Sequence, residues 1–217
     1  MNHSSYRFRV LITMLAVVSL CNAQFTFRNG DLIFSVGKSN SDMQAAIQHA
    51  TAQPSQLPYT HVGIVHTSND SVYVIEATTP QGVQKVTLQA FMAEVATHQN
   101  KSYAAVGRIK TQHLNTIENA LKYAQAKIGC AYDYVYNESN NAFYCSELVR
   151  KSFLTKDGSY LFPAIKMTFK DQQTGQYHPY WVKHFSELNT PIPEGEPGTN
   201  PAQLAQSDVI EIVHRFF

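Results

Sequence analysis

The chain has 217 residues, enough to bury a hydrophobic core in one ordinary globular domain. Hydrophobic residues make up 44% and aromatic residues 12%, which excludes a disordered chain, since such chains are poor in aromatics and high in net charge. The 17 basic and 16 acidic residues give a formal charge of +1, so there is no basic field of the kind that binds nucleic acid, and no nucleic-acid partner is expected.

Residues 1–23 have the pattern of a secretory signal peptide. Arg7 and Arg9 precede the apolar run Val10–Leu20, and a small residue, Ala23, stands at the expected cut. The run is shorter than the ~20 apolar residues that span a bilayer. Cleavage after Ala23 leaves 15 basic and 16 acidic residues in a mature chain, 24–217, that we predict to be a single domain in the periplasm or outside the cell.

Cys21 leaves a second interpretation of this segment open. A cysteine that ends the apolar run can be the lipid-modified residue of a bacterial lipoprotein. Such signals usually carry Gly, Ala or Ser just before the cysteine, and Leu20 stands there instead. The composition therefore favours an ordinary cleaved signal over a lipid anchor.

The rest of the chain alternates between β-rich runs and helical spacing. Apolar, β-branched runs bounded by turn residues predict strands over 31–36, 61–66, 72–77, 83–86, 103–109 and 209–213. Apolar residues at helical spacing, with caps and stops, predict helices over 42–52, 88–95, 114–128, 144–153 and 180–188. Short turns join the second, third and fourth strands, which predicts an antiparallel meander. The fold class is therefore α+β, an antiparallel sheet of about five to six strands with packed helices.

Cys145 stands where nucleophilic chemistry would place a thiol. It follows a Tyr-rich loop and lies at the start of a predicted helix, where the positive end of the helix dipole stabilises a thiolate. Unpaired N–H groups of the first helical turn can also donate to the oxyanion of an acyl-transfer intermediate. The alternative is that Cys145 is a small core residue, as cysteine often is.

His61 and Glu76 are the candidate partners of this thiol. His61 opens an apolar strand, and Glu76 interrupts the apolar run of the next strand. An acid on the strand beside the histidine can accept the second ring N–H and hold the tautomer. Glu76 as an outward-facing strand residue is the alternative. The sequence contains no C-x-x-C pair and no His pair at helical spacing, so no metal site or cofactor is predicted.

The order of these pieces resembles the permuted papain-like hydrolases of the NlpC/P60 superfamily, and within it the YiiX/YebB-like branch. In this branch the histidine strand precedes the cysteine helix. The matching segments run from about residue 29 to 150, and they are the opening strand 29–34, the histidine motif 60–64, the acid motif 74–77, the loop residues 128–129 and 132–133, and the cysteine helix 143–149.

The resemblance implies that Cys145 is the nucleophile, His61 the general base and Glu76 the group that orients the imidazole. Tyr132 and Asp133, in the loop before the nucleophile, are candidates to line the cleft and bind substrate, and so is Tyr144. Each aromatic ring can equally cover the core.

Two further residues near the proposed nucleophile, Cys130 and Glu147, need a separate interpretation. Cys130 stands after the loop glycine, where family members often carry Lys or another polar residue, and it is either a packed thiol or a partner for a regulatory Cys130–Cys145 disulfide. Glu147, two residues after the nucleophile, is expected to face solvent or bind a neighbouring Arg rather than act as the catalytic acid.

The expected activity is cofactor-free hydrolysis of an amide through a thioester on Cys145. The candidate substrates are a peptide, a muropeptide or an acylated small molecule, in association with the cell envelope. Two alternatives remain at this point: an acyl hydrolase or acyltransferase acting on lipids, and a catalytically silent module that binds a wall fragment or peptide. The sequence does not indicate the oligomeric state.

Overall fold

The computed structural model describes residues 25–38, 41–52 and 57–217. The signal-peptide and Cys21 predictions lie outside these residues. The strands of the main sheet are β1 (Leu32–Ser35), β2 (His61–Ser68), β3 (Ser71–Thr78), β4 (Gly82–Thr87), β7 (Ala104–Ile109) and β10 (Ile210–Arg215). The helices are α1 (Asp42–Thr51), α2 (Leu88–Ala93), α3 (Ile117–Ala126), α4 (Cys145–Ser152), α5 (Pro179–Glu187) and α6 (Pro201–Ala205).

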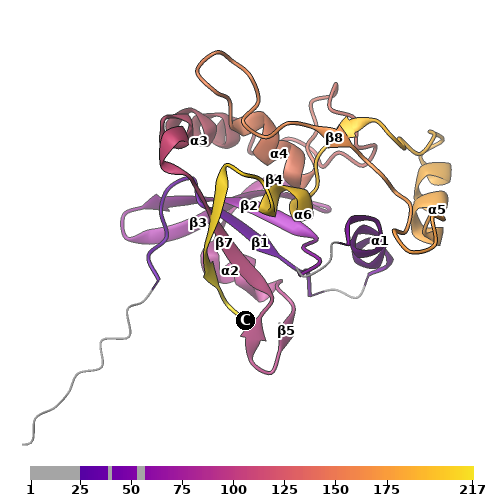
Figure 1. Ribbon diagram of the computed structural model, residues 1–217, viewed down its shortest axis with the longest axis horizontal. Helices are drawn as coiled ribbons and strands as arrows, with labels where there is room; N and C mark the ends of the chain where they lie inside the picture. The colour runs from indigo at the N-terminus through magenta and orange to yellow at the C-terminus, as the bar shows by residue number, and fades with distance from the viewer. Residues whose placement is uncertain (1–24, 39–40, 53–56) are drawn as a thin grey trace, which may run out of the picture.

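The centre of the molecule is a six-stranded sheet in the order β10-β7-β1-β2-β3-β4, in which every neighbouring pair is antiparallel (Figure 1). This confirms the predicted α+β class, and β2, β3 and β4 form the predicted meander. β1 lies between β2 and β7 and is the strand whose residues are buried throughout.

Both faces of the sheet are covered, and side chains along β1 alternate between the two layers. Leu32 and Phe34 belong to the larger apolar cluster, whereas Ile33 belongs to a smaller cluster with Phe91 of α2. Because successive strand residues point to opposite faces, a two-sided core requires an almost unbroken apolar run, which β1 has.

Helix α4 packs against β2, β3 and α3, which places its first residue over the sheet. Helices α1 and α5 lie side by side at one end of the molecule (Figure 1). The helix predicted over 114–128 is divided, since a 3-10 helix over Thr111–Thr116 precedes α3. Gly129, at φ 93°, adopts the left-handed conformation that favours glycine just after the helix.

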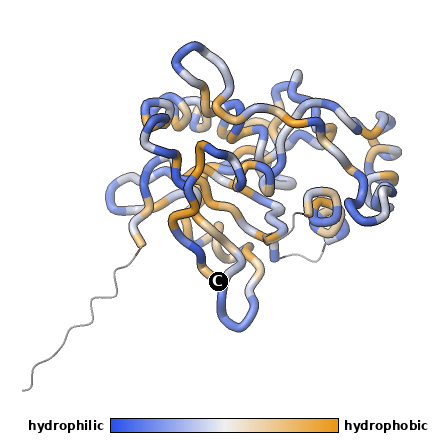
Figure 2. Tube along the Cα trace, viewed as in Figure 1, coloured by the Kyte–Doolittle hydropathy of each residue, from blue (hydrophilic) through white to orange (hydrophobic). Residues whose placement is uncertain are grey.

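Several small elements were not predicted. β5 (Thr97–His98) pairs with β6 (Lys101–Ser102), and β8 (Ile165–Lys166) pairs with β9 (Pro197–Gly198). Strands of two residues have no period to detect, and helix α6 has only five residues. The β5–β6 hairpin is hydrophilic and projects from the sheet, whereas the central strands are apolar (Figure 2).

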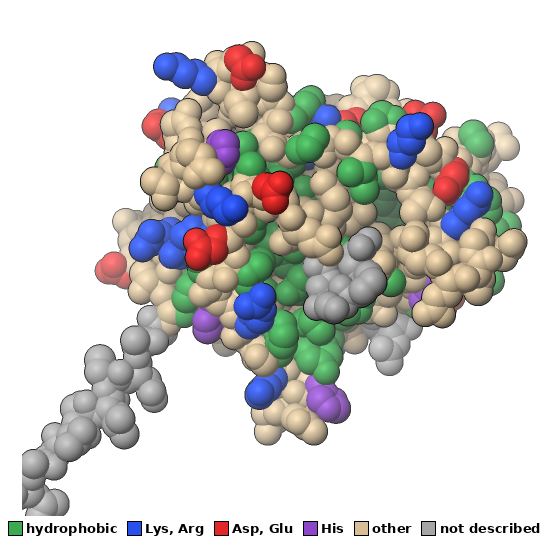
Figure 3. Space-filling view, viewed as in Figure 1, with side chains coloured by type: hydrophobic (Ala, Val, Ile, Leu, Met, Phe, Trp, Pro, Cys, Tyr) green, Lys and Arg blue, Asp and Glu red, His purple; other side chains and the backbone are tan. Residues whose placement is uncertain are grey.

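The surface charges are mixed, as the near-neutral composition predicts. On the face shown in Figure 3, Lys and Arg side chains are interspersed with Asp and Glu. In the described part of the chain, no helix combines the length and the apolar character needed to cross a bilayer.

An ion pair with a buried carboxylate connects the residue before β1 to the neighbouring strand β7. Asp31 is 1% exposed and accepts from Arg108 Nε at Oδ1 and from a terminal guanidinium nitrogen at Oδ2, each over 2.8 Å. The backbone N–H of Arg28 also donates to the carboxylate over 2.8 Å. A bidentate pair of this kind adds geometric specificity, and here it holds the segment before β1 against β7.

Candidate active site

Cys145 is the first residue of α4 and lies on the side of the helix that faces β2. Tyr144 precedes it as the N-cap in extended conformation. The N–H groups of the first helical turn have no acceptor within the helix, so those of Cys145 and Ser146 are available near the sulfur. The thiol therefore stands beside hydrogen-bond donors and at the positive end of the helix dipole.

Hydrogen bonds to a distant loop hold this helix start in place. Ser146 Oγ donates to the carbonyl of Thr199 over 2.9 Å, and the N–H of Thr199 donates to the Tyr144 hydroxyl over 3.3 Å. Both contacts link α4 to the turn that precedes α6. The C-terminal part of the chain thus positions Cys145, although it carries none of the predicted catalytic residues.

Glu147 corrects a prediction, because it does not face solvent. It is 0% exposed, it pairs with Lys151 over 2.7 Å, and it accepts from the Tyr144 N–H over 3.2 Å. Burial raises the pKa of Glu147 to about 7, although Lys151 opposes the shift. Helix α4 is buried on most sides. The Glu147 carboxylate, at the third helical position, therefore caps the helix N-terminus by accepting from the Tyr144 N–H and does not reach water.

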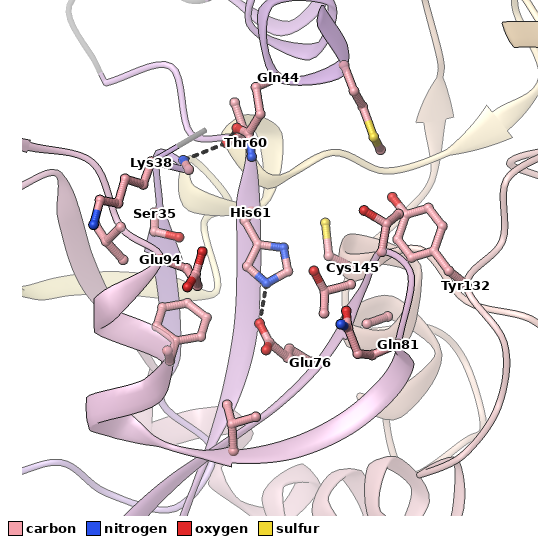
Figure 4. A pocket seen from close by; sticks show the side chains of 18 of the residues that line it. Ser35, Lys38, Gln44, Thr60, His61, Glu76, Gln81, Glu94, Tyr132 and Cys145 are labelled. Atoms are coloured by element: carbon pink, nitrogen blue, oxygen red, sulfur yellow. Dashed lines mark hydrogen bonds and ion pairs between the residues drawn. The ribbon is translucent and has the colours of Figure 1, made fainter. Parts of the chain in front are cut away.

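His61 begins β2 and lies between Cys145 and Glu76. Its Nε2 donates to Glu76 Oε2 over 2.5 Å, and the other ring nitrogen, Nδ1, faces the sulfur of Cys145 (Figure 4). Glu76 reaches this position from β3, the strand paired with β2. The three residues that the sequence placed far apart are therefore brought into one line of sulfur, imidazole and carboxylate.

The environment of His61 stabilises its charged form. Burial alone would lower the pKa of His61, but hydrogen bonds with Cys145 and Glu76 and the charges of both groups raise this pKa to about 10. Burial would raise the pKa of Glu76, yet the interaction with His61 holds it below its ordinary value. The geometry thus favours an imidazolium paired with a carboxylate.

Two positioning contacts were missed by the sequence analysis. Gln84, the residue of β4 directly paired with Glu76, donates from Nε2 to Glu76 Oε1 over 2.9 Å. Phe91 of α2 stacks on the imidazole with ring centroids 5.7 Å apart and an angle of 26°. The register of the predicted hairpin could have placed Gln84 opposite Glu76. No local sequence signal could have identified Phe91, because α2 contacts His61 only in the folded chain.

A cavity of about 650 Å³ opens at this line of residues. Its lining includes Cys145, His61 and Glu76, together with polar side chains from α1 and from the turn before β4. Thr60, directly before His61, donates to Gln44 Oε1 over 2.5 Å, which ties α1 to the rim (Figure 4). The cavity places Cys145, His61 and Glu76 within reach of a ligand.

A second cavity of about 60 Å³ lies on another side of Cys145. Tyr132 lines both cavities, whereas Tyr144 lines only the small one. The Tyr144 hydroxyl is directed at Met167 Sδ, 3.8 Å away, and the residue is buried. Two of the three predicted substrate-binding residues therefore border a cavity.

Asp133 lies elsewhere. Its buried carboxylate accepts from the N–H of Val135 over 3.0 Å, the N–H of Asn137 over 2.7 Å and the amide of Asn140 over 3.0 Å. Asp133 is absent from the lining of the two cavities at Cys145. The sequence analysis expected Asp133 to line the cleft. In the structure its carboxylate instead accepts hydrogen bonds from N–H groups of its own loop.

Cys130 and Cys145 are both free thiols in the structure. Cys130 follows Gly129, and its carbonyl accepts from the Val83 N–H over 2.8 Å at the start of β4. Gly82, at φ 75°, lies so close that a Cβ there would stand 2.1 Å from the Cys130 carbonyl oxygen. The backbone of Cys130 therefore anchors the loop to the meander.

Comparison with known proteins assigns the sequence to a family. The family model described as permuted papain-like amidase enzyme, YaeF/YiiX, C92 family, matches residues 26–214. The chain belongs to this family. Membership confirms the resemblance drawn from the sequence, and it agrees with the order of the histidine and acid strands before the cysteine helix.

This chain is also similar to two individual proteins. It is 32% identical over 148 residues to the uncharacterized protein YiiX of Escherichia coli strain K12, a match that covers 67% of this chain and 66% of that protein, just under two thirds of its length. A crystal structure of the metalloprotein yiiX from Escherichia coli O157:H7, DUF1105, has a TM-score of 0.69 at 23% identity and covers 87% of this chain and 97% of that one. This second likeness shows a shared fold.

One of these two similar proteins is called a metalloprotein, which raises the question of a metal centre in this chain. Within 25–38, 41–52 and 57–217, no three His, Cys, Asp or Glu side chains are grouped so that they can hold a metal ion. His61 and Glu76 are hydrogen-bonded to each other, so each is already satisfied by a protein partner. The Escherichia coli O157:H7 protein is called a metalloprotein, and the described residues of this chain contain no grouped donor set for a metal ion.

Proposed function

We propose that this protein is a cysteine amidase of the cell envelope that cleaves an amide through a thioester on Cys145. The observation that carries the proposal is the placement of His61 between the Cys145 sulfur and the Glu76 carboxylate at one cavity. The family is one of amidases, which supports the same chemistry. Secretion is proposed from the signal-peptide pattern of residues 1–23.

The reaction follows from this geometry. The Cys145 thiolate attacks the amide carbon, and the N–H groups of the first turn of α4 stabilise the oxyanion. The C–N bond then breaks as His61 gives its Nδ1 proton to the leaving nitrogen. Water attacks the thioester with His61 as base, which releases a carboxylic acid and restores the thiol. Glu76 keeps Nδ1 directed at the sulfur throughout.

An amide of peptidoglycan is the proposed natural substrate class, because the signal-peptide pattern of residues 1–23 predicts export to the cell envelope. To test this, mature protein is incubated with purified peptidoglycan and new amine termini are measured, with Cys145→Ala as the control. We expect release of amines by the native protein alone. Saturable binding with no product, and no thioester detected on Cys145 by intact mass, would instead identify a silent binding module.

A further inference from the structure

The two cavities at Cys145 differ in size and in charge. The large one, at about 650 Å³, includes the ionisable groups of Lys38, Glu94, His61 and Glu76 in its lining. The small one, at about 60 Å³, has no Asp, Glu, Lys, Arg or His among the described residues that line it. Trp181, Phe169 and Met167, all buried, form part of its wall.

His61 determines which half of a substrate enters each cavity. The proton that the leaving nitrogen needs comes from His61, so the amine half must lie on the histidine side of the sulfur. His61 lines the large cavity and is absent from the lining of the small one. The acyl half, which stays on the sulfur as the thioester, is then left with the small cavity.

We infer that this enzyme acts on amides whose acyl half is compact and uncharged and whose amine half is large and polar. The inference rests on the proposed amidase function. At roughly 15 Å³ for each water-sized position, the small cavity holds about four such positions. An acyl group of about four non-hydrogen atoms fills it. A charged acyl group finds no opposite charge among the described residues of the wall, so the cost of desolvation disfavours it.

The experiment measures amine release from a series of N-acylated Gln-Lys dipeptides by the mature protein, with Cys145→Ala as blank. The acyl group grows from acetyl through butyryl and hexanoyl to palmitoyl. We expect a maximum near butyryl and at least a tenfold fall in kcat/KM for palmitoyl. Succinyl, a butyryl analogue with a carboxylate, should fall at least tenfold below butyryl. The reversed arrangement, a Gln-Lys acyl half on methylamine, should be a poor substrate.

Variants of the small cavity give the second arm. Met167→Ala enlarges it and should move the optimum toward hexanoyl, whereas Ala50→Val, from α1, narrows it and should move the optimum toward acetyl. Leu161→Ala is the matched control, since Leu161 is 6% exposed, similar to Met167 at 7%, and lines neither cavity. It should leave the order of acyl preference unchanged.

The outcomes separate the two proposals. Cys145-dependent release that is flat or rises with chain length, or that favours the reversed amide, overturns the cavity assignment and leaves the amidase proposal intact. Absence of Cys145-dependent product from the series and from peptidoglycan, with no thioester on Cys145, overturns both. Opposite shifts of the optimum in the enlarged and narrowed variants support the assignment.

Discussion

Gln84 and Glu76 face each other on neighbouring strands, and the Gln84 amide donates to the carboxylate oxygen that His61 leaves free. Each Glu76 oxygen thus has one donor, which fixes the carboxylate plane and, through it, the imidazole. In the proposed reaction we therefore assign Gln84 as a positioning residue that acts through Glu76.

Replacing Gln84 with Leu should lower kcat/KM about three- to tenfold, as loss of one hydrogen bond of ~1 kcal/mol implies. Because the Gln84 amide helps to hold the pKa of Glu76 down, the acid limb of the pH profile should also move to higher pH. The profile is measured alongside Lys85→Leu, the next residue on β4, which points to the other face. An unmoved acid limb in the Gln84 variant would contradict the positioning role.

The alkaline limb of activity should report His61. Its pKa is raised to about 10, so the imidazolium, and the stability that its pairing contributes, is fully present below about 6.5 and is lost as pH rises through 10. We expect kcat/KM to fall only near pH 10. Glu76→Gln removes a carboxylate that raises this pKa and should move the limb to lower pH while retaining part of the activity.

Loss of the imidazole gives the complementary result. His61→Ala should abolish turnover while the protein stays folded, which circular dichroism checks, because His61 lies at a strand start. Wild-type rates in this variant would remove His61 from the mechanism.

Alkylation should distinguish the two thiols. Cys145 combines a helix N-terminus with an imidazole partner, whereas Cys130 follows a helix end. Iodoacetamide near pH 6, followed by peptide mass spectrometry, should modify Cys145 first. Equal labelling, or preference for Cys130, would argue against the assignment, and the His61→Ala variant should slow the labelling of Cys145 alone.

The Asp31–Arg108 pair should matter for stability. Asp31→Ala leaves the half-buried Arg108 guanidinium of β7 without its bidentate partner, and loss of a hydrogen bond to a charged group costs about 1.5 to 3 kcal/mol. Urea unfolding measures the change. Glu118→Ala breaks an exposed pair with Lys122 and should leave the unfolding midpoint unchanged.

Asp133 provides a test of its own placement. Asp133→Ala removes the acceptor for three donors of the loop, so we expect faster proteolysis within 134–140 and a lower unfolding midpoint. If Asp133 instead binds substrate, the variant should keep its stability and show only a raised KM.

The sequence by itself determined the six strands of the main sheet, the main helices and the identity of the three residues aligned at the cavity. Strand alternation, helical spacing and turn residues are local signals, and Cys145, His61 and Glu76 each stand at a position that such signals mark. The order of these motifs was also enough to indicate the permuted family, which the family match confirms.

Only the tertiary structure decided what surrounds those residues. The stacking of Phe91 on His61 and the hydrogen bond from α4 to Thr199 join segments that lie far apart in the chain. The burial of Glu147 depends on the elements that pack around α4. The direction of the Asp133 carboxylate depends on a loop without periodicity. Likewise, the two cavities form where α1, the meander, α4 and the C-terminal segments meet, and packing between distant elements leaves no mark on local spacing.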